Sequence, residues 1–329
     1  MIIDLCRMGQ ANRLDQMRHF RKIFYLCYVI YLLIIIVTKT QNQLFVKIVK
    51  MIFKEKGIFF SIRVLCFSIA SFLFFLSLEP IAYCKDDGKD LSIGERFHSD
   101  TELSWLGVVG DLFRSKPEKP SQYKTYPDAK MMKLPKPEFQ GMPLEDAINK
   151  RRSVRNYSKK PMTLFQLSQL LHAAQGVTGK IYGQSLRTAP SAGALYPFEI
   201  YVIVNNVQDL EKGVYHYAVP DHALELVKSG DFGKKITSAG LKQEMLGDAN
   251  ATFVLSAVFN RTRHKYGERG YRYVYIEAGH ISQNIYLQAV SLGLGSVVVG
   301  AFIDKEVNEL IEVDGQKEAA IYLHAVGAM

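Results

Sequence analysis

The stretch Arg187–Val204, RTAPSAGALYPFEIYVIV, joins a turn of small residues to an apolar run. Small residues allow the backbone to come very close to a flat or bulky group. The run Phe198–Val204 is rich in β-branched and aromatic residues, which is typical of a buried strand. A tight turn ahead of a rigid strand can hold a planar ligand through main-chain N–H groups. The alternative, which this stretch taken alone favours, is an ordinary loop before a core strand.

The segments on both sides of the turn predict further helices and strands. Upstream, Leu144–Lys150 is a short amphipathic helix, and Thr163 with Gln166 forms a capping box that opens a helix to Gln175. Glycines 176, 179 and 183 then predict a flexible loop. Downstream we expect a hairpin (213–217 and 223–227), a helix (232–246), strands (252–259, 296–300 and 319–326), a long helix (271–292) and a helix from its cap Asp304 to Ile311. This order predicts an α+β fold with a mixed, mostly antiparallel sheet flanked by helices, one of them long and central.

The charge of the chain is concentrated in its first part. The 329 residues, 48% of them hydrophobic, suffice for one large domain or two small ones. Residues 1–84 carry eleven Lys/Arg against four acids, a charge of +7, which leaves +2 of the total +9 for residues 85–329. Because the excess lies among apolar runs, it indicates membrane topology, and we expect no nucleic-acid partner.

All four cysteines, Cys6, Cys27, Cys66 and Cys84, also lie in this first part. Residues 85–329 therefore have no disulfide, no thiolate metal site and no cysteine nucleophile. We predict no metal centre, so the chemistry must use other groups.

Residues 1–84 are predicted to be a hydrophobic leader. It contains two apolar runs of 15 residues, Ile23–Val37 and Val64–Leu78, each shorter than the roughly 20 residues that a spanning helix needs. From Met51 the chain has a basic start, an apolar run and small residues before a polar stretch, which is typical of a secretory signal peptide. Two interpretations stay open: a signal peptide that starts at Met51, or a two-helix transmembrane anchor starting at Met1.

The leader predicts a membrane-associated or exported, extracytoplasmic protein, because its basic residues precede the second apolar run. An anchor that leaves the domain facing the cytoplasm is the alternative. Residues 85–143 are polar and proline-rich and predict an extended arm, with at most a short helix near 105–113. The globular domain is expected at 144–329.

Two basic segments flank the turn in sequence. Arg151, Arg152, Ser153 and Arg155 can bind a phosphate through charge-assisted, forked hydrogen bonds. The second segment is a predicted loop with Lys265 and Tyr266 among arginines 261, 263, 269 and 272. A lysine among cations has its charged form disfavoured, which would help it act as a base, and a neighbouring tyrosine can relay a proton. In each case the alternative is a solvated basic surface.

Several motifs together resemble a known family. They are RRSVRNY, LLHAAQGVTG, RTAPSAGALYPFEIYV, GVYHY, KYGERGYRYVYIEAGHISQN and LGLGSVVVGAF. In this order they are similar to the SagB/ThcOx branch of the FMN-dependent nitroreductase family, from about His98 to the C-terminus. The resemblance implies a nitroreductase-like fold and a homodimer with FMN at the subunit interface.

The resemblance also implies roles for particular residues. It assigns the FMN phosphate and ribityl chain to Arg151, Arg152, Ser153 and Arg155, one side of the isoalloxazine ring to Ser191, Ala192, Gly193 and Ala194, and the other side to Val299, Gly300 and Ala301. Lys265 and Tyr266 match a pair that acts in azoline oxidation, where the ring loses a proton to a base and a hydride to flavin N5. Ala194 departs from the Asn of classical members, and the C-terminus lacks their basic residues.

The function expected from this resemblance is an FMN-dependent oxidoreductase with two-electron hydride transfer through flavin N5. It would dehydrogenate an azoline-like or other small-molecule or peptide substrate, with Lys265 and Tyr266 handling the proton. One alternative is a nitro or quinone reductase with NAD(P)H as electron donor. Another is a non-catalytic, flavin-binding protein tethered to the membrane through an uncleaved leader.

Overall fold

The computed structural model describes residues 91–104, 115–181 and 183–329, which belong to one compact unit beginning at Leu91. The leader and the predicted short helix near 105–113 lie outside the described residues. Within these ranges, no helix combines the length and apolar character needed to cross a bilayer. The signal peptide and the membrane anchor therefore stay predictions.

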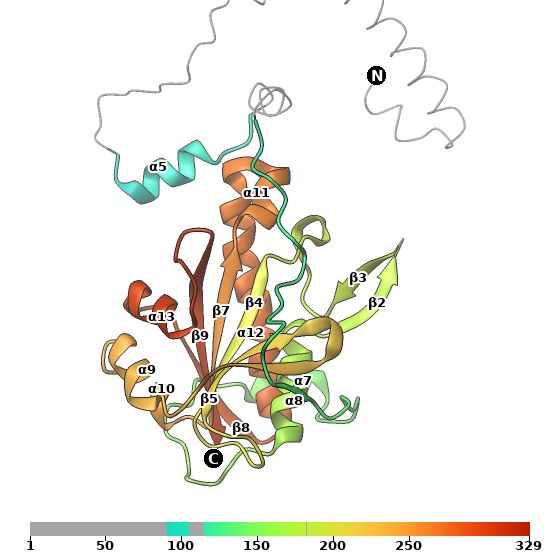
Figure 1. The fold of residues 1–329 in the computed structure, drawn as a ribbon, viewed down its shortest axis with the longest axis vertical. Coiled ribbons are helices and arrows are strands. Elements are labelled where there is room, and N and C mark those ends of the chain that lie inside the picture. The colour runs from blue at the N-terminus through green and yellow to red at the C-terminus, as the bar shows by residue number, and fades with distance from the viewer. Residues whose placement is uncertain (1–90, 105–114, 182) are drawn as a thin grey trace, which may run out of the picture. The chain divides into compact units, whose positions relative to one another are not determined.

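A seven-stranded sheet in the order β1-β6-β5-β4-β7-β9-β8 forms the centre of the unit (Figure 1). All neighbouring strands in it run antiparallel. The strands are β1 (Met131–Lys133), β4 (Phe198–Val204), β5 (Gly213–Ala218), β6 (Ala223–Ser229), β7 (Ala251–Val258), β8 (Leu294–Val299) and β9 (Glu318–Ala328). The predicted α+β class and mostly antiparallel sheet are confirmed.

Strand β4, the apolar run of the opening stretch, is buried along its whole length. Successive side chains of a strand point to opposite faces, so β4 contributes to two cores. Phe198, Ile200 and Val202 pack in one core and Tyr201 and Ile203 in the other. A strand buried on both faces must be apolar nearly throughout, which is why this run was recognisable from sequence.

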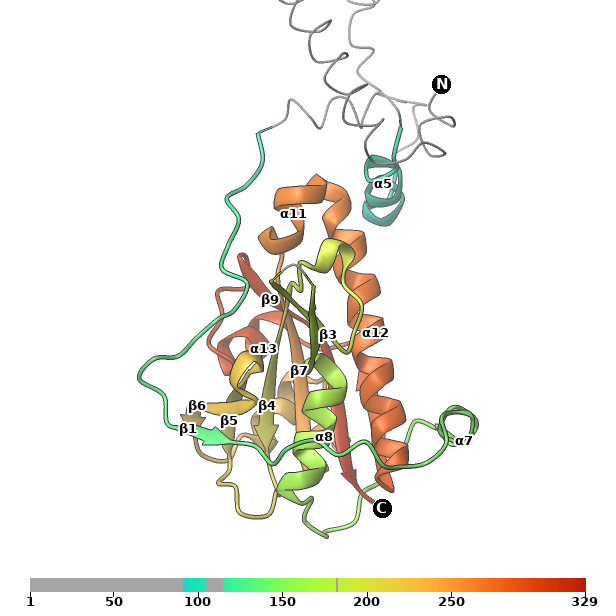
Figure 2. The same cartoon turned by 90° about the vertical axis from the view of Figure 1, so that its right-hand side faces the viewer.

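Helices cover both faces of the sheet (Figures 1 and 2). Helices α8 (Leu164–Gln175) and α12 (Gly270–Ser291) pack on one face, and their buried residues join the first core. Helices α9 (Gly233–Ala239), α10 (Met245–Asp248) and α13 (Asp304–Leu310) pack on the other. The long central helix is α12, as predicted.

The predicted capping box at the start of α8 is confirmed. Thr163 Oγ1 accepts from the Gln166 backbone N–H at 3.1 Å, and Gln166 Oε1 accepts from the Thr163 backbone N–H at 3.0 Å. These bonds satisfy donors that a helix start leaves unpaired. The short helix α7 (Leu144–Lys150) also forms, but of its predicted apolar face only Ala147 is buried, while Leu144 and Ile148 remain exposed.

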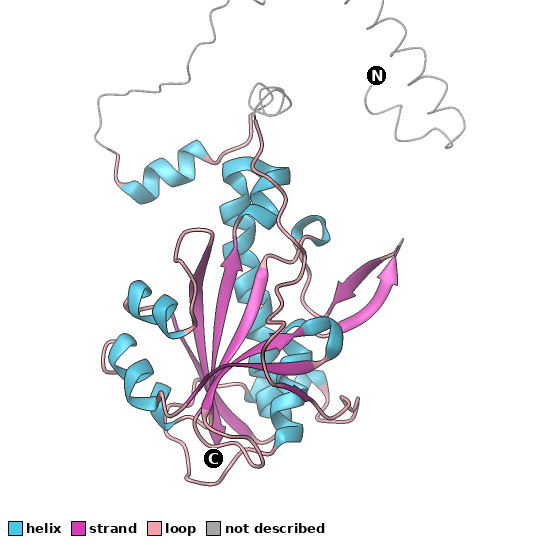
Figure 3. Ribbon diagram, viewed as in Figure 1, coloured by secondary structure: helices cyan, strands magenta, loops and turns pink. Residues whose placement is uncertain are grey.

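Three local predictions were wrong. The glycine-containing loop at 176–183 is part of a hairpin, β2 (Val177–Ile181) and β3 (Gln184–Arg187), that stands apart from the main sheet (Figure 3). The single helix expected at 232–246 is interrupted, because Leu241 and Lys242 adopt positive φ. Asp304 does not cap α13, since the N-cap position is Ile303 and no side chain bonds there.

The arm packs against the unit's own sheet. Its residues 131–133 form edge strand β1 on β6. Earlier in the chain, α5 (Ile93–Asp100) starts with a capping box between Ser92 and Glu95. We did not predict α5, although the Ser-x-x-Glu spacing was a readable signal.

Candidate active site

The small-residue turn forms a short 3-10 helix, η1 (Ala192–Ala194), between β3 and β4. Gly193 and Ala194 have left-handed backbones, with φ of 62° and 53°. The Ala194 backbone N–H donates to Ser191 O at 3.0 Å, and Gln184 Nε2 of the hairpin donates to Ala194 O at 2.5 Å. The hairpin therefore holds the turn from one side.

Lys265 and Tyr266 lie directly against this turn. A Cβ atom added to Gly193 would stand 2.7 Å from Tyr266 Oη and 2.8 Å from Lys265 Nζ. A side chain at this position would therefore force the ends of Tyr266 and Lys265 to shift, since real Cβ contacts are not that short. The structure thus brings two predicted groups of site residues, the turn and the Lys-Tyr pair, into contact.

The Lys-Tyr pair sits on a helix, so the predicted loop was wrong. Helix α11 (Asn260–Tyr266) is followed by the 3-10 helix η3 (Gly267–Arg269) and then by α12. Its position is set by the guanidinium of Arg261, which is 4% exposed. Arg261 forms an ion pair with Glu199 at 2.6 Å and donates to Ser121 O at 2.6 Å and Tyr196 O at 3.4 Å. One side chain therefore ties α11 to β4, the arm and the turn.

A buried polar network extends from this ion pair across the sheet. Each ring nitrogen of His216 is hydrogen-bonded to a carboxylate. Nε2 lies 3.0 Å from Glu199 Oε2, and Nδ1 lies 2.7 Å from Glu225 Oε2. Burial works against the charged form of His216, but the hydrogen bonds to both glutamates prevail and raise its pKa. Burial likewise opposes ionisation of Glu199, yet the His216 hydrogen bond and the Arg261 charge lower its pKa. The arm closes the network, because the Lys124 backbone N–H donates to Glu199 at 3.1 Å.

The other arginines around Lys265 bind partners of their own. Arg263 pairs with Glu268 at 2.5 Å. Arg269 donates to Tyr273 Oη at 3.1 Å and to Thr101 O at 2.7 Å. Arg272 donates to the Thr101 hydroxyl at 2.5 Å, next to α5. These arginines thus fix the surroundings of α11 and dock the segment after α5.

The predicted phosphate segment lies elsewhere on the fold. Ser153 forms a parallel bridge with Ser296 of β8, and its hydroxyl lies 3.2 Å from Tyr286 Oη. The Arg151 guanidinium stacks over the Tyr286 ring at 5.1 Å from the ring centre. Arg152 turns back and donates to the Asn149 and Arg151 carbonyls. Arg155 is exposed and free to meet a ligand.

Within one chain, the phosphate segment and the turn are separated along α12. Tyr286 of α12 lies beside Ser153, and Gly270 at the start of α12 follows the Lys-Tyr pair. At about 1.5 Å per residue, these two positions are about 24 Å apart along the helix axis. No hydrogen bond or ion pair of the described residues joins the two groups. The structure therefore brings Lys265 and Tyr266 to the turn but leaves Arg151–Arg155 apart from them.

The third predicted segment follows the end of β8. Val299 is 4% exposed and packs in the second core, whereas Gly300 and Ala301 are exposed. The Ala301 carbonyl accepts from Gln243 Nε2 at 3.1 Å. Gly300 and Ala301 are therefore accessible to a ligand, but Val299 is not accessible through its side chain.

These surfaces fit FMN. The turn offers a half-exposed backbone with small side chains and a left-handed glycine, which a flat ring can approach closely. The exposed guanidinium of Arg155 and the hydroxyl of Ser153 suit a phosphate. The turn thus suits the ring of FMN and the Arg151–Arg155 segment suits its phosphate, although one chain alone does not bring the two together.

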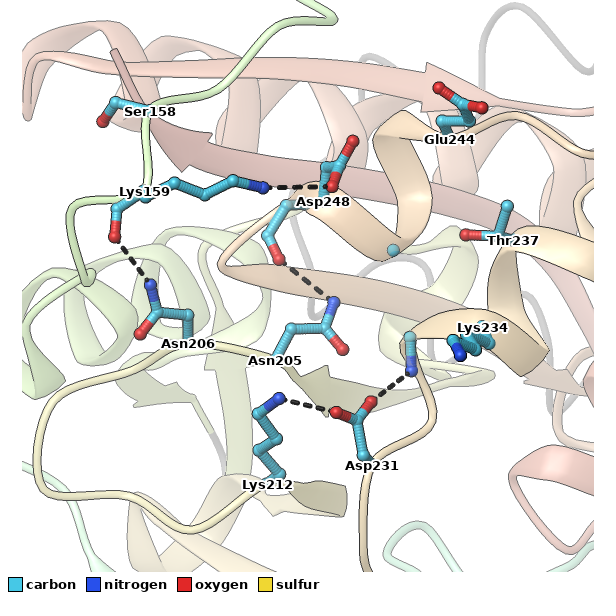
Figure 4. Close-up of a pocket in the computed structure, with 13 residues that line it drawn as sticks. Ser158, Lys159, Asn205, Asn206, Lys212, Asp231, Lys234, Thr237, Glu244 and Asp248 are labelled. Carbon is cyan, nitrogen blue, oxygen red and sulfur yellow. Dashed lines mark hydrogen bonds and ion pairs between the residues drawn. The ribbon is translucent and has the colours of Figure 1, made fainter.

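Two other features of the described residues bear on the site. A hollow of about 540 Å³ lies between the loop before α8, the residues after β4, and helices α9 and α10; in it Lys159 pairs with Asp248 and Lys212 with Asp231 (Figure 4). None of the predicted site residues lines it, so the hollow does not define the active site. Among the residues that the structure describes, no group of three or more His, Cys, Asp or Glu could hold a metal ion.

Sequence reasoning missed a group of buried polar residues behind the turn: Gln175, Arg187 and Glu277. Glu277 lies on α12, and burial raises its pKa to about 8. An acidic residue in the apolar pattern of a central helix was a signal that could have identified it.

Comparison with known proteins agrees with this fold. The profile described as "Nitroreductase family" matches residues 148–328. The chain is 43% identical to the "Putative nitroreductase MJ1384" of Methanocaldococcus jannaschii, over 60% of this chain and 96% of that protein. The chain therefore belongs to the nitroreductase family. Family membership supports an oxidoreductase, and members typically bind flavin.

Two further relatives refine this assignment. The chain is 31% identical to the "Microcin B17-processing protein McbC" of Escherichia coli, over 44% of this chain and 55% of the relative. It is 32% identical to the "Trifolitoxin-processing protein TfxB" of Rhizobium leguminosarum bv. trifolii, over 45% of this chain and 42% of the relative. The chain thus spans about half the length of these two proteins, and the matches support the SagB-like branch that the motifs predicted.

Two solved structures share the fold. A putative nitroreductase from Anabaena variabilis has a TM-score of 0.58 and 26% identity, covering 71% of this chain and 46% of that chain. A putative nitroreductase from Ralstonia eutropha has a TM-score of 0.53 and 28% identity, covering 65% of this chain and 97% of that chain. The nitroreductase-like fold predicted from the motifs is therefore confirmed.

Replacing Gly193 by alanine should disturb the contact between the turn and the Lys-Tyr pair. The left-handed backbone costs alanine about 1 kcal/mol, so we expect a loss of unfolding free energy of that size. The new Cβ would also push Tyr266 Oη and Lys265 Nζ away, and misplacement by about 1 Å can reduce a rate about 100-fold. Denaturant unfolding and turnover measure the two effects.

The matched control is Gly179→Ala in β2, where an added Cβ meets no atom within 4 Å. Equal turnover in the two variants would contradict the importance of the contact at Gly193.

Proposed function

We propose that this chain is an FMN-dependent oxidoreductase that removes a hydride and a proton, two electrons and two protons in all, from a small or peptide-derived substrate. The observation that carries the proposal is the contact of Lys265 and Tyr266 with the flavin-binding turn at Gly193. The Lys265 amine, the Tyr266 hydroxyl and a backbone surface that a planar ring can approach therefore lie together.

Each group has a separate task. Bound FMN supplies the two-electron redox chemistry. The exposed Lys265 amine takes the proton from the substrate carbon, and the Tyr266 hydroxyl beside it orients the substrate or relays that proton. Arg261 acts on the pair as a positioning residue, because it fixes α11 against β4 and the turn.

The names of two relatives support a peptide-derived substrate. McbC and TfxB are each described as processing proteins, of microcin B17 and of trifolitoxin. We therefore propose an azoline-like ring within a peptide as the substrate class, with dehydrogenation as the reaction. An azoline-containing peptide mixed anaerobically with the FMN-loaded protein should bleach the flavin absorbance, and an unmodified peptide should not.

A nitroreductase with a nicotinamide donor is the second candidate. It is favoured by the 43% identity to the "Putative nitroreductase MJ1384" across nearly all of that protein. Anaerobic mixing with NADH or NADPH separates the two functions. Prompt bleaching by the nicotinamide alone supports the reductase, and its absence supports the dehydrogenase.

We propose that the site is completed in a homodimer. The two predicted halves of the flavin site, Arg151–Arg155 and Ser191–Ala194, lie apart in one chain, so a second copy would have to bring them to one cofactor. Exposed apolar side chains support such an interface: Ile276 of α12 is 56% exposed, and Leu144 and Ile148 of α7 are 58% and 55% exposed. Sedimentation of the purified protein with and without FMN measures the oligomeric state.

The leader assigns no function by itself, but it bears on location. We propose that residues 1–84 direct the domain to the membrane or across it. The N-terminal sequence of the protein isolated from its own cells distinguishes a cleaved signal peptide from a retained anchor.

Removing two guanidiniums from the phosphate segment should weaken FMN binding strongly. A hydrogen bond to a charged group contributes about 1.5–3 kcal/mol, so Arg151→Ala combined with Arg155→Ala is expected to raise the Kd of FMN at least about 100-fold. Fluorescence titration of the flavin-free protein with FMN measures this.

Arg152→Ala is the matched control for that variant. Its guanidinium already donates to the Asn149 and Arg151 carbonyls, so we expect a smaller loss of affinity. An unchanged Kd in the double variant would rule out the phosphate role of this segment.

A further inference from the structure

Three buried polar side chains from three elements meet behind the flavin-binding turn. They are Gln175 at the end of α8, Arg187 at the end of β3 and Glu277 on α12, exposed by 0%, 6% and 2%. Arg187 Nη1 donates to Gln175 Oε1 at 3.0 Å. Ser191, the first residue of the turn, lies between this cluster and the surface, and its hydroxyl accepts from the Tyr196 backbone N–H at 2.8 Å.

The hydrogen bonds of this cluster are incomplete. Gln175 Nε2, Arg187 Nε and Glu277 Oε1 have no partner among the described residues. Buried polar atoms without partners are rare in proteins, and they gather where a group must change its protonation or its partner. Here two donors and one acceptor of neighbouring buried side chains lack a well-formed hydrogen bond, although Gln175 and Ser191 lie close enough to Glu277 to lower its pKa.

The charges of the cluster are also unbalanced. No carboxylate of the described residues forms an ion pair with Arg187, whose guanidinium lies 4.7 Å from the Tyr196 ring centre and 5.1 Å from that of Tyr123. Glu277 faces Arg187 from β3, Gln175 from α8 and Ser191 from the turn. Burial raises the pKa of Glu277 to about 8, although Ser191, Arg187 and Gln175 each lower it. The Arg187–Glu277 pair is therefore cationic below this pH and neutral above it.

We propose that Glu277 exchanges a proton as the flavin held by the Ser191–Ala194 turn changes charge. The inference rests on the proposed FMN site. Bound FMN would accept two electrons and one proton from the substrate, which would add one negative charge to the group held by the turn. The new negative charge beside the turn then favours uptake of a second proton, from solvent, by the Glu277 carboxylate. The half-buried Ser191 hydroxyl, which contacts Glu277, provides the route to the surface.

The coupling has a defined electrochemical signature. One proton per two electrons changes the equilibrium constant tenfold per pH unit, which is about 30 mV. Below about pH 8 Glu277 is protonated in both redox states, so the FMN midpoint potential should fall by that amount per pH unit. Above this pH the slope should approach twice the value, because Glu277 gains a proton only on reduction.

The test compares the FMN-loaded protein with its Glu277→Gln variant, which keeps the shape of the side chain but cannot ionise. Midpoint potentials are measured between about pH 7 and pH 9.5 with equilibrated redox dyes. We expect the steeper limb above about pH 8 in the natural protein and a single-proton slope throughout in the variant. Glu306→Gln, an exposed carboxyl on α13, is the matched control and should keep the steep limb. Identical slopes in the natural protein and Glu277→Gln would overturn the proposal.

A second measurement needs no variant. Reduction of the natural protein by a limiting amount of dithionite in weakly buffered solution, near pH 8.5, should take up clearly more than one proton per two electrons in the flavin centre once the reagent's own protons are subtracted. Uptake of a single proton would overturn the coupling of Glu277 to flavin reduction but would leave the proposed FMN site in place. A chain that takes up no FMN fails the proposed function as well, and the absence of flavin absorbance shows this before any potential is measured.

Discussion

Glu199→Gln is expected to lower the free energy of unfolding by about 3–5 kcal/mol, because it leaves Arg261 buried without its counter-charge. The two side chains are each 4% exposed and 2.6 Å apart. The same substitution also takes a carboxylate from His216, whose other neighbour is Glu225. Denaturant unfolding measures the loss, and the midpoint should shift without a change in slope.

Glu309→Gln is the matched control, since its ion pair with Lys305 is 3.8 Å long and largely exposed. Such pairs contribute about 0–1 kcal/mol. A loss in Glu199→Gln no larger than in the control would contradict the role of the buried pair.

The same network predicts how stability varies with pH. The pKa of Glu199 is lowered from 4.5, so its contribution is present above that pH and is lost as the pH falls through the folded value. The pKa of His216 is raised from 6.5, so its contribution is present below that pH and is lost as the pH rises through the folded value. Both contributions are complete between about pH 4.5 and 6.5, and Glu199→Gln should flatten the dependence on both sides.

Lys265→Met and Tyr266→Phe are expected to reduce the rate of substrate oxidation by about 10²–10⁴-fold, the usual contribution of a positioned acid or base. Both head groups touch the turn at Gly193. Neither side chain carries a described contact that holds the core, so FMN content and unfolding free energy should change little. Stopped-flow reduction of the bound flavin by an azoline-containing peptide measures the rate.

Lys305→Met on the exposed surface of α13 is the control for a lost lysine charge. If Lys265→Met reduces the flavin at the natural rate with the same FMN content, the lysine is not the base. A rate that rises with pH in the natural protein and loses this pH dependence in Lys265→Met would instead support a proton-accepting role.

Much of the scaffold could be predicted because its determinants are local. The β-branched run of β4 and the capping box at Thr163 each identify an element within a few residues. Helix α11 could not be predicted in this way, since RTRHKY has no apolar periodicity. It forms where Arg261 reaches Glu199 and two carbonyls that come from other parts of the chain.

The buried network was invisible for a related reason. An alternating polar residue in a strand, such as Glu199, normally indicates a solvent-facing side of the sheet. Here the arm covers that side, and Lys124 and Tyr126 supply partners to Glu199 and Glu225. Likewise the contact of Gly193 with Lys265 depends on how α11 docks, which local patterns do not specify. The resemblance assigned the turn and the Lys-Tyr pair to one flavin site, but only the structure shows that the two are in contact.

The arm also constrains the order in which the domain can fold. Lys124 donates to Glu318 of β9, 194 positions further along the chain, and Arg261 binds Ser121 across 140 positions. Contacts of such sequence separation slow folding, because a long loop must close before they form. The arm emerges from the ribosome early, yet its binding surface is complete only when the last strand has been made. Sealing of the polar network by the arm therefore follows the synthesis of β9.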